Sequence, residues 1–173
     1  MFKKSSWLHY IVLAVICAVV LRTFFFSPVT VLGASMQPTY HNQDKVMIMK
    51  NTSLKRHDVI VFASDTTDEN FIKRIIGVPG DTIEVKNNVV YVNGKKQKES
   101  YLKDAPSSYK ETTGNDYTYD FTLEEMTGKS VVPKGHYFVL GDNRPNSEDS
   151  RAYGFISEQQ VYGKVLFKYY QHE

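Results

Sequence analysis

The segment FIKRIIGVPGD occupies residues 71–81 of this chain. Apolar residues and two basic ones fill its first half, and the glycines and proline of its second half predict a turn after a strand. In a strand alternate residues share a face, so Lys73 lies with Phe71 and Ile75, and Arg74 lies on the other face. Burial would lower the pKa of Lys73 and produce the neutral amine that a general base needs. The pattern leaves it open whether the Lys73 face is instead solvated with Arg74 buried, or whether both side chains reach water.

The chain on both sides of this strand is also β-rich. Asn87-Asn88 and Asn93-Gly94 are typical of tight hairpin turns, because both pairs tolerate positive φ. No repeat and no long amphipathic helix follows residue 26. Short apolar or alternating runs predict strands at 46–49, 59–62, 71–76, 82–85, 89–92, 131–132, 136–140 and 161–169.

Residues 95–129 differ from their surroundings, because they are polar and contain few aliphatic side chains. We interpret them as a small insertion lobe, with a short helix around Leu123 to Met126. A mobile surface loop is the alternative.

The N-terminal segment is apolar from Trp7 to Phe26 and has the length of a helix that crosses a bilayer. Lys3 and Lys4 precede it, so the positive-inside rule places residues 1–6 in the cytoplasm and the rest of the chain, after the anchor at 7–26, outside. A cleavable signal peptide is the competing interpretation. An uncleaved anchor is favoured, because no small-x-small cleavage site follows the apolar run directly.

Composition excludes several classes of function. The net charge is +2, and the 21 Lys and Arg are scattered, which argues against a nucleic-acid partner. Cys17 is the single cysteine, so the chain has no internal disulfide and no cysteine-rich metal site. The five histidines show no HExxH spacing. We therefore expect neither a metal nor a cofactor.

Two further segments look unlike plain scaffold. GASMQPT, residues 33–39, places Ser35 after two small residues that let a peptide backbone approach, although a serine in a turn is usually structural. GDNRPNSEDSRAYG, residues 141–154, follows a predicted strand and is dense in hydrogen-bonding side chains. It suits either a solvated loop or a set of side chains that orients a site.

The order of these three segments resembles the signature of type I signal peptidases. The matching residues are Ser35-Met36-x-Pro38, Lys73-Arg74-x-x-Gly77-x-Pro79-Gly80-Asp81 and Gly141-Asp142-Asn143-Arg144-x-Asn146-Ser147-x-Asp149-Ser150-Arg151-x-x-Gly154. A single anchor and a small middle region are similar to Gram-positive members. The resemblance implies a mainly β fold, an antiparallel protease core over 27–94 and 130–173, with 95–129 as the smaller lobe.

The resemblance also implies roles for single residues. Ser35 would be the nucleophile and Lys73 the general base, with the Ser35 backbone N–H stabilising the oxyanion. Gly33 stands where some members carry a second, hydroxyl donor, so that donor stays open. Ser147 would orient the lysine, and Asp149 with Arg151 would form a supporting ion pair.

The function implied is a membrane-bound serine protease that removes signal peptides after an Ala-x-Ala-like site. The substrates are signal peptides of secreted preproteins, which would add as a strand near 28–33 and 70–73. We expect a monomer in the cell membrane, in contact with the lipid bilayer and with its catalytic domain outside.

Three alternatives were considered. Self-cleaving repressor-type proteins share the Ser–Lys dyad but carry a DNA-binding helical domain, which this chain lacks. A Ser–His–Asp enzyme would use His136 with Asp142, although His136 begins an apolar strand. An inactive, membrane-tethered adaptor domain is the non-enzyme alternative.

Overall fold

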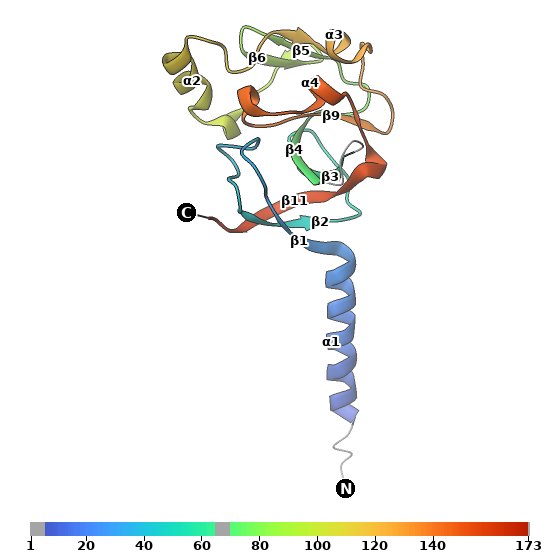
Figure 1. The fold of residues 1–173 in the computed structure, drawn as a ribbon. Helices are drawn as coiled ribbons and strands as arrows, with labels where there is room; N and C mark the ends of the chain where they lie inside the picture. Colours follow the sequence, from blue (N-terminus) through green and yellow to red (C-terminus); the bar gives the residue numbers. More distant parts are fainter. Residues whose placement is uncertain (1–5, 65–69, 173) are drawn as a thin grey trace.

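The computed structural model describes residues 6–64 and 70–172. Helix α1 (Ser6–Phe25) stands apart from a β-rich domain (Figure 1). Its apolar side chains, from Trp7 to Phe24, are mostly more than half exposed. By length and composition the stretch Trp7–Phe25 is able to cross a membrane. Of the predicted cytoplasmic segment 1–6, residues 1–5 lie outside the described part of the chain.

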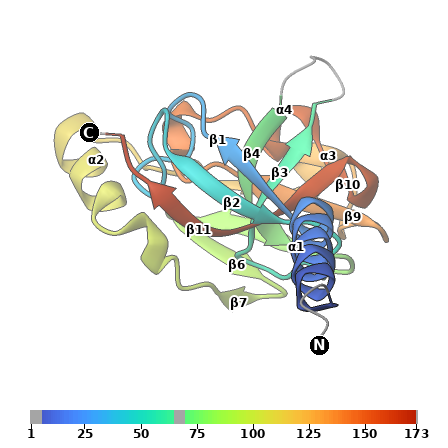
Figure 2. The same cartoon turned by 90° about the horizontal axis from the view of Figure 1, so that it is seen from below.

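A seven-stranded sheet forms the larger part of the domain, in the order β1-β2-β11-β3-β4-β9-β10. All of its strand pairs are antiparallel, which confirms the predicted mainly β, antiparallel fold. α1 runs directly into β1, and β2 and β11 follow beside it (Figure 2). The strands are β1 (Phe26–Thr30), β2 (Lys45–Met49), β3 (Val59–Ala63), β4 (Asn70–Gly77), β9 (His136–Leu140), β10 (Ile156–Ser157) and β11 (Val161–Tyr170).

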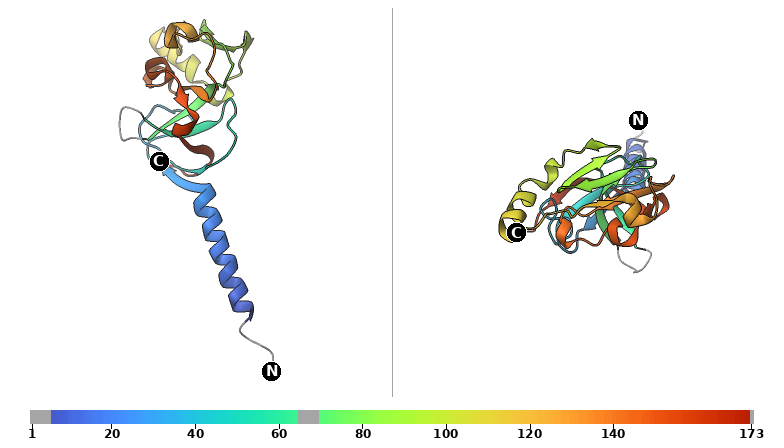
Figure 3. Two further views of the ribbon diagram at one scale, coloured as in Figure 1. Left: turned by 90° about the vertical axis from the view of Figure 1, so that its right-hand side faces the viewer. Right: turned by 90° about the horizontal axis from the view of Figure 1, so that it is seen from above.

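A second, four-stranded sheet lies at the end of the domain far from α1 (Figures 1 and 3). Its order is β7-β6-β5-β8, with β5 (Ile83–Lys86), β6 (Val89–Val92), β7 (Lys95–Lys96) and β8 (Phe121–Thr122). The turns that join β5, β6 and β7 have positive φ at Asn87, Asn88, Asn93 and Gly94, which confirms both predicted hairpins. The predicted lobe boundary between residues 94 and 95 falls inside this sheet, because β5 and β6 precede it and β7 and β8 follow it.

Three α-helices lie near this sheet: α2 (Ala105–Thr113), α3 (Leu123–Thr127) and α4 (Ser150–Tyr153). The predicted short helix is confirmed as α3, which starts with a capping box between Thr122 and Glu125. α2 was not predicted, because it is polar on all sides and none of its residues is buried. Single 3₁₀ turns lie at Ser100–Leu102, Arg144–Asn146 and Glu158–Gln160.

One predicted strand is wrong. Val131 and Val132 form no strand, because the backbone of Val132 bonds to a turn instead: its carbonyl accepts from Gly80 N and its N–H donates to Asp81 O. The apolar run is explained by Val132, which is 2% exposed and packs in a buried cluster with Ile83 and Val85 of β5.

Strand β4 lies at the centre of the hydrophobic core. Ile72, Ile75 and Ile76 each belong to a different cluster of buried side chains. β3 and β9 flank β4, and both of its faces are covered. Lys73 is 3% exposed and Arg74 is 7% exposed. The Lys73 face is therefore not solvated, and the two side chains do not both reach water, so neither alternative left open by the sequence holds.

Candidate active site

The turn that carries Ser35 is held from both sides. Gly33 has φ of +82°, and its N–H donates to Asn42 Oδ1 at 2.9 Å. Met36 is 1% exposed and packs in the core beside Val31. Because the residue after Ser35 is anchored in the core, the half-buried serine stays at the edge of the sheet with its hydroxyl available.

Ser35 and Lys73 are in direct contact. Lys73 Nζ lies 2.8 Å from Ser35 Oγ and 3.1 Å from the carbonyl oxygen of Ile72. Burial lowers the pKa of Lys73 to about 8, although the nearby carboxylates of Asp149, Glu148 and Asp142 act in the opposite direction. A substantial fraction of this amine is therefore neutral near pH 8, and the pair has the geometry of a nucleophile and its base.

Asp149 and Arg151 form an ion pair behind this contact. Arg151 donates to Asp149 through Nε at 2.8 Å and through Nη2 at 2.8 Å, and the Asp149 side chain is fully buried. Asp149 also accepts from Gly141 N at 3.0 Å and caps the start of α4. The pair thus ties the end of β9 to the loop that follows it. Its predicted supporting role stays a prediction.

Ser147 lies against Gly141. A Cβ atom at position 141 would lie 2.0 Å from Ser147 Oγ and 2.6 Å from the carbonyl oxygen of Ser35. Only glycine therefore lets Ser147 and the Ser35 backbone come together here. The buried Ser147 Oγ has no hydrogen-bond partner within residues 6–64 and 70–172. The role of Ser147 in orienting Lys73 remains a prediction.

Asp142 and Asn143 hold the turn that carries Ser35 in place. Asn143 donates its backbone N–H to Ser35 O at 2.9 Å and its Nδ2 to Ala34 O at 3.1 Å. Asp142 accepts from Thr39 Oγ1 at 2.6 Å and forms a buried pair with Arg74. In the sequence, Asp142 and Asn143 belong to the third segment that resembles the signal peptidase signature, a polar run directly after an apolar strand.

The small lobe packs on the same network. The Tyr101 ring lies over the Arg74 guanidinium, 3.8 Å from ring centroid to Cζ, and Tyr117 donates its hydroxyl to Asp142 O at 2.8 Å. Arg144, 1% exposed, donates to Gly141 O at 2.9 Å and pairs with Glu99 of the lobe. The lobe therefore shields the back of the site from water.

The alternative Ser–His–Asp arrangement has no support in these contacts. His136 Nδ1 lies 3.0 Å from the carbonyl oxygen of Lys134. The carboxylate of Asp142 is occupied by Arg74 and Thr39.

A groove of about 680 Å³ runs beside Ser35 and Lys73. It is lined by residues 28–33 on one side and by Val61 and residues 70–72 on the other. The groove thus ends two residues before Ser35 and one residue before Lys73. Within the described residues there is no cluster of three or more His, Cys, Asp or Glu that could hold a metal ion.

Comparison with known proteins gives consistent matches over nearly the whole chain. The family model "Signal peptidase, peptidase S26" matches residues 4–170. Signal peptidase I of Bacillus caldolyticus is 44% identical, with 97% of this chain and 91% of that protein covered. Signal peptidase IB of Staphylococcus aureus is 39% identical, with 95% and 88% covered.

A solved structure agrees with these relatives. The crystal structure of a signal peptidase I from Enterococcus faecalis superposes with a TM-score of 0.61 at 43% identity, and covers 67% of this chain and 98% of that chain. The chain belongs to the signal peptidase family, peptidase S26.

Proposed function

We propose that this signal peptidase cleaves its substrates with Ser35 as nucleophile and Lys73 as general base. The observation that carries the proposal is the 2.8 Å contact between Ser35 Oγ and the buried Lys73 amine. A serine hydroxyl is a weak nucleophile, and a neutral amine at hydrogen-bond distance is able to take its proton as the hydroxyl attacks.

The reaction would proceed through an acyl-enzyme. Ser35 Oγ attacks the scissile carbonyl carbon, Lys73 takes the hydroxyl proton, and the Ser35 backbone N–H stabilises the oxyanion. The ammonium of Lys73 then gives its proton to the departing amine, and the C–N bond breaks. Water then attacks the ester carbon while Lys73 takes one of its protons. The bond from that carbon to Ser35 Oγ breaks, and the Lys73 ammonium returns the proton to Ser35 Oγ. The signal peptide leaves as a carboxylic acid, which gives its proton to water.

The groove beside the dyad is the proposed site of the signal peptide. β9 pairs with β4 from Arg74 onward, so within the described strands the edge of residues 70–73 on that side is left without a strand partner. An extended peptide could add to this edge by backbone hydrogen bonds. The groove walls include Val29, Val31 and Ile72, and shallow apolar walls of this kind favour small side chains, as in an Ala-x-Ala site.

We propose further that α1 anchors the enzyme as a single-pass monomer, with the catalytic domain outside the cell membrane. α1 continues into β1 without a loop, so the sheet edge lies where the helix would leave the bilayer (Figure 1). Strand β11, which pairs with the other edge of β2, exposes Leu166, Phe167, Tyr169 and Tyr170, whose apolar and amphipathic side chains suit a membrane–water interface.

The test is cleavage of an Ala-x-Ala preprotein by the full chain in detergent micelles or lipid vesicles. Ser35→Ala and Lys73→Ala should each abolish cleavage, while circular dichroism shows an intact fold. Cleavage that persists in either variant would point to another nucleophile or base. Failure of the unmodified chain to cleave would favour the adaptor alternative.

A further inference from the structure

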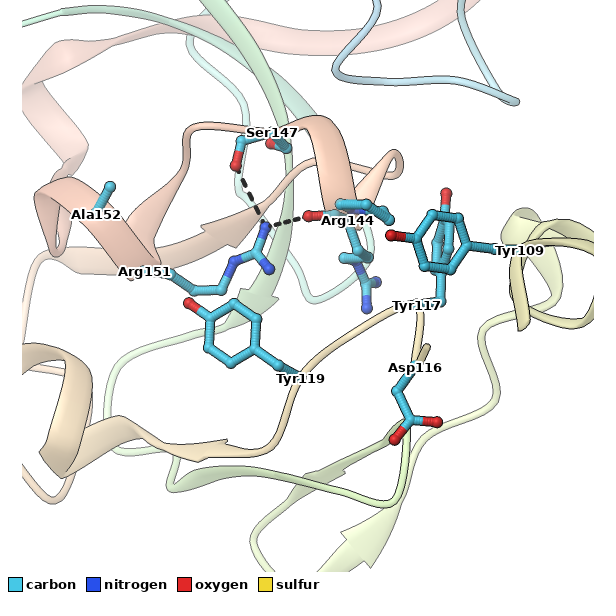
Figure 4. Close-up of a pocket in the computed structure, with 9 residues that line it drawn as sticks. Tyr109, Asp116, Tyr117, Tyr119, Arg144, Ser147, Arg151 and Ala152 are labelled. Carbon is cyan, nitrogen blue, oxygen red and sulfur yellow. Dashed lines mark hydrogen bonds between the residues drawn. The ribbon is translucent and has the colours of Figure 1, made fainter. Parts of the chain in front are cut away.

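A second hollow lies behind the Ser147 loop, away from the groove. It has a volume of about 320 Å³ and is bounded by the small lobe on one side and by the segment 144–152 on the other. Figure 4 shows the side chains of Tyr109, Asp116, Tyr117, Tyr119, Ser147 and Arg151 around it. We call this hollow the tyrosine pocket.

The charged groups in the wall of the tyrosine pocket already have partners. Arg144 is paired with Glu99, Arg151 with the buried Asp149, and Asp116 with Lys110 at the surface. A free ion would therefore gain little there. What remains is mainly the faces of the tyrosine rings, because the Tyr117 hydroxyl already donates to Asp142 O and the Tyr119 hydroxyl contacts Met126 Sδ at 3.9 Å. The Tyr119 ring lies under the Arg151 guanidinium at 5.2 Å. Tyrosine-rich, mostly uncharged walls suit a short stretch of peptide, whose amides hydrogen-bond and whose side chains pack on the rings.

Ser147 connects the tyrosine pocket to the dyad. Ser147 lines the pocket and also packs against Gly141. The Ser35 carbonyl oxygen approaches Gly141 as well, because a Cβ atom at position 141 would meet both Ser147 Oγ and Ser35 O. The signal-peptide groove is lined by β1 residues next to α1, whereas the tyrosine pocket is lined by the lobe at the other end of the domain (Figure 1). A peptide that enters from the helix end and passes Ser35 would continue toward the lobe.

We propose that the tyrosine pocket binds the residues of the preprotein that follow the scissile bond. This rests on the proposed function, since it assumes that the peptide is cut at Ser35. The small lobe would then contribute to substrate choice through the mature part of the preprotein, in addition to the selection of small side chains before the cut.

Two variants alter the tyrosine pocket without touching the dyad. Tyr109→Ala removes a ring donated by α2, and Ala152→Trp fills the pocket from the exposed face of α4. Tyr91→Ala is the matched control for the first, because Tyr91 is a half-buried tyrosine of β6, in the four-stranded sheet, that does not line the pocket. Ser107→Trp, on an exposed position of α2, is the control for the second.

Each variant is assayed as the full chain in detergent micelles with two peptides that share one Ala-x-Ala signal side. The long peptide continues with six residues after the cut, and the short peptide carries only a small amide-linked fluorophore there. We expect Tyr109→Ala and Ala152→Trp to raise KM for the long peptide fivefold or more, and to change KM for the short peptide by less than twofold. The two controls should leave both values unchanged.

Either of two outcomes would overturn the proposal. Equal losses on both peptides would mean that the pocket acts only through the position of Ser147 and Arg151. Unchanged KM on both peptides would mean that nothing binds there. Binding of the two uncleaved peptides to Ser35→Ala is measured by fluorescence anisotropy. This measurement tests the tyrosine-pocket proposal independently of the proposed function. If Ser35→Ala still cleaves, the dyad assignment fails, while the difference in affinity between the peptides still tests the pocket.

Discussion

Arg74 and Asp142 meet inside the protein through two parallel hydrogen bonds, Nε to Oδ1 at 2.9 Å and Nη2 to Oδ2 at 2.6 Å. Arg74 follows Lys73 in β4, and Asp142 precedes the residue that holds the Ser35 carbonyl. The same carboxylate accepts from Thr39, four residues after Ser35. One buried ion pair therefore joins the segments that carry both members of the proposed dyad.

Asp142→Asn should destabilise the protein strongly, because it leaves the Arg74 charge buried without a counter-charge. We expect a loss of about 3 kcal/mol in the free energy of unfolding, measured by urea denaturation in detergent. Lys110→Met breaks a pair whose side chains are 62% and 41% exposed, and should cost less than about 0.5 kcal/mol. Equal stability of Asp142→Asn and the unmodified chain would show that the pair is not needed to hold these segments.

Gly141→Ala should abolish cleavage. Its new Cβ would meet Ser147 Oγ at 2.0 Å and the Ser35 carbonyl oxygen at 2.6 Å, so the backbone of the proposed nucleophile must move. Gly77→Ala is a contrasting variant, because its Cβ would press mainly on the end of the Ile83 side chain, at 2.5 Å. That overpacking should cost roughly 1–3 kcal/mol of stability with a much smaller loss of activity per folded molecule. Similar activity in the two variants would contradict the close approach at Gly141.

The pH dependence of cleavage should follow the protonation of Lys73. Burial lowers the pKa of this group to about 8, and only the neutral amine acts as a base. We expect kcat/KM to rise about tenfold per pH unit below pH 8 and to level off above it. The measurement uses a peptide without titratable side chains, from pH 6 to pH 10. A rate that is constant between pH 6 and pH 9 would exclude Lys73 as the base.

Lys73→Met should be inactive and yet more stable than the unmodified chain at pH 7. The pKa of Lys73 is about 8 in the folded protein, whereas an exposed lysine of the unfolded chain has a pKa of 10.5. Between these values the unfolded chain binds more protons, so stability rises with pH. Below pH 8 the folded state carries the full penalty for the buried ammonium, about 3 kcal/mol by the size of the shift.

Unfolding of the two proteins at several pH values tests this directly. The advantage of Lys73→Met should be largest below pH 8 and should shrink as the pH approaches 10.5. A difference that does not change with pH would mean that the gain comes from packing alone.

Local sequence patterns predicted much of the fold. The hairpins at Asn87-Asn88 and Asn93-Gly94 and the helix after Thr122 follow from side chains that act within a few residues of their own backbone. α2 and the loop at Val131-Val132 were missed for the opposite reason. A polar helix without a buried face shows no apolar period, and an apolar pair that bonds to a distant turn looks like a strand.

For the site, the sequence reveals the residue types, the order of the three segments and the period that places Lys73 among apolar neighbours on β4. The fold adds that Lys73 and Arg74 are both buried, that Lys73 lies 2.8 Å from Ser35, and that Arg74 pairs with Asp142. These features cannot be read locally, because desolvation depends on everything that packs around a residue. The desolvation that lowers the pKa of Lys73 is produced by β3, β9 and the other elements that pack around β4, and no pattern within the strand contains that information.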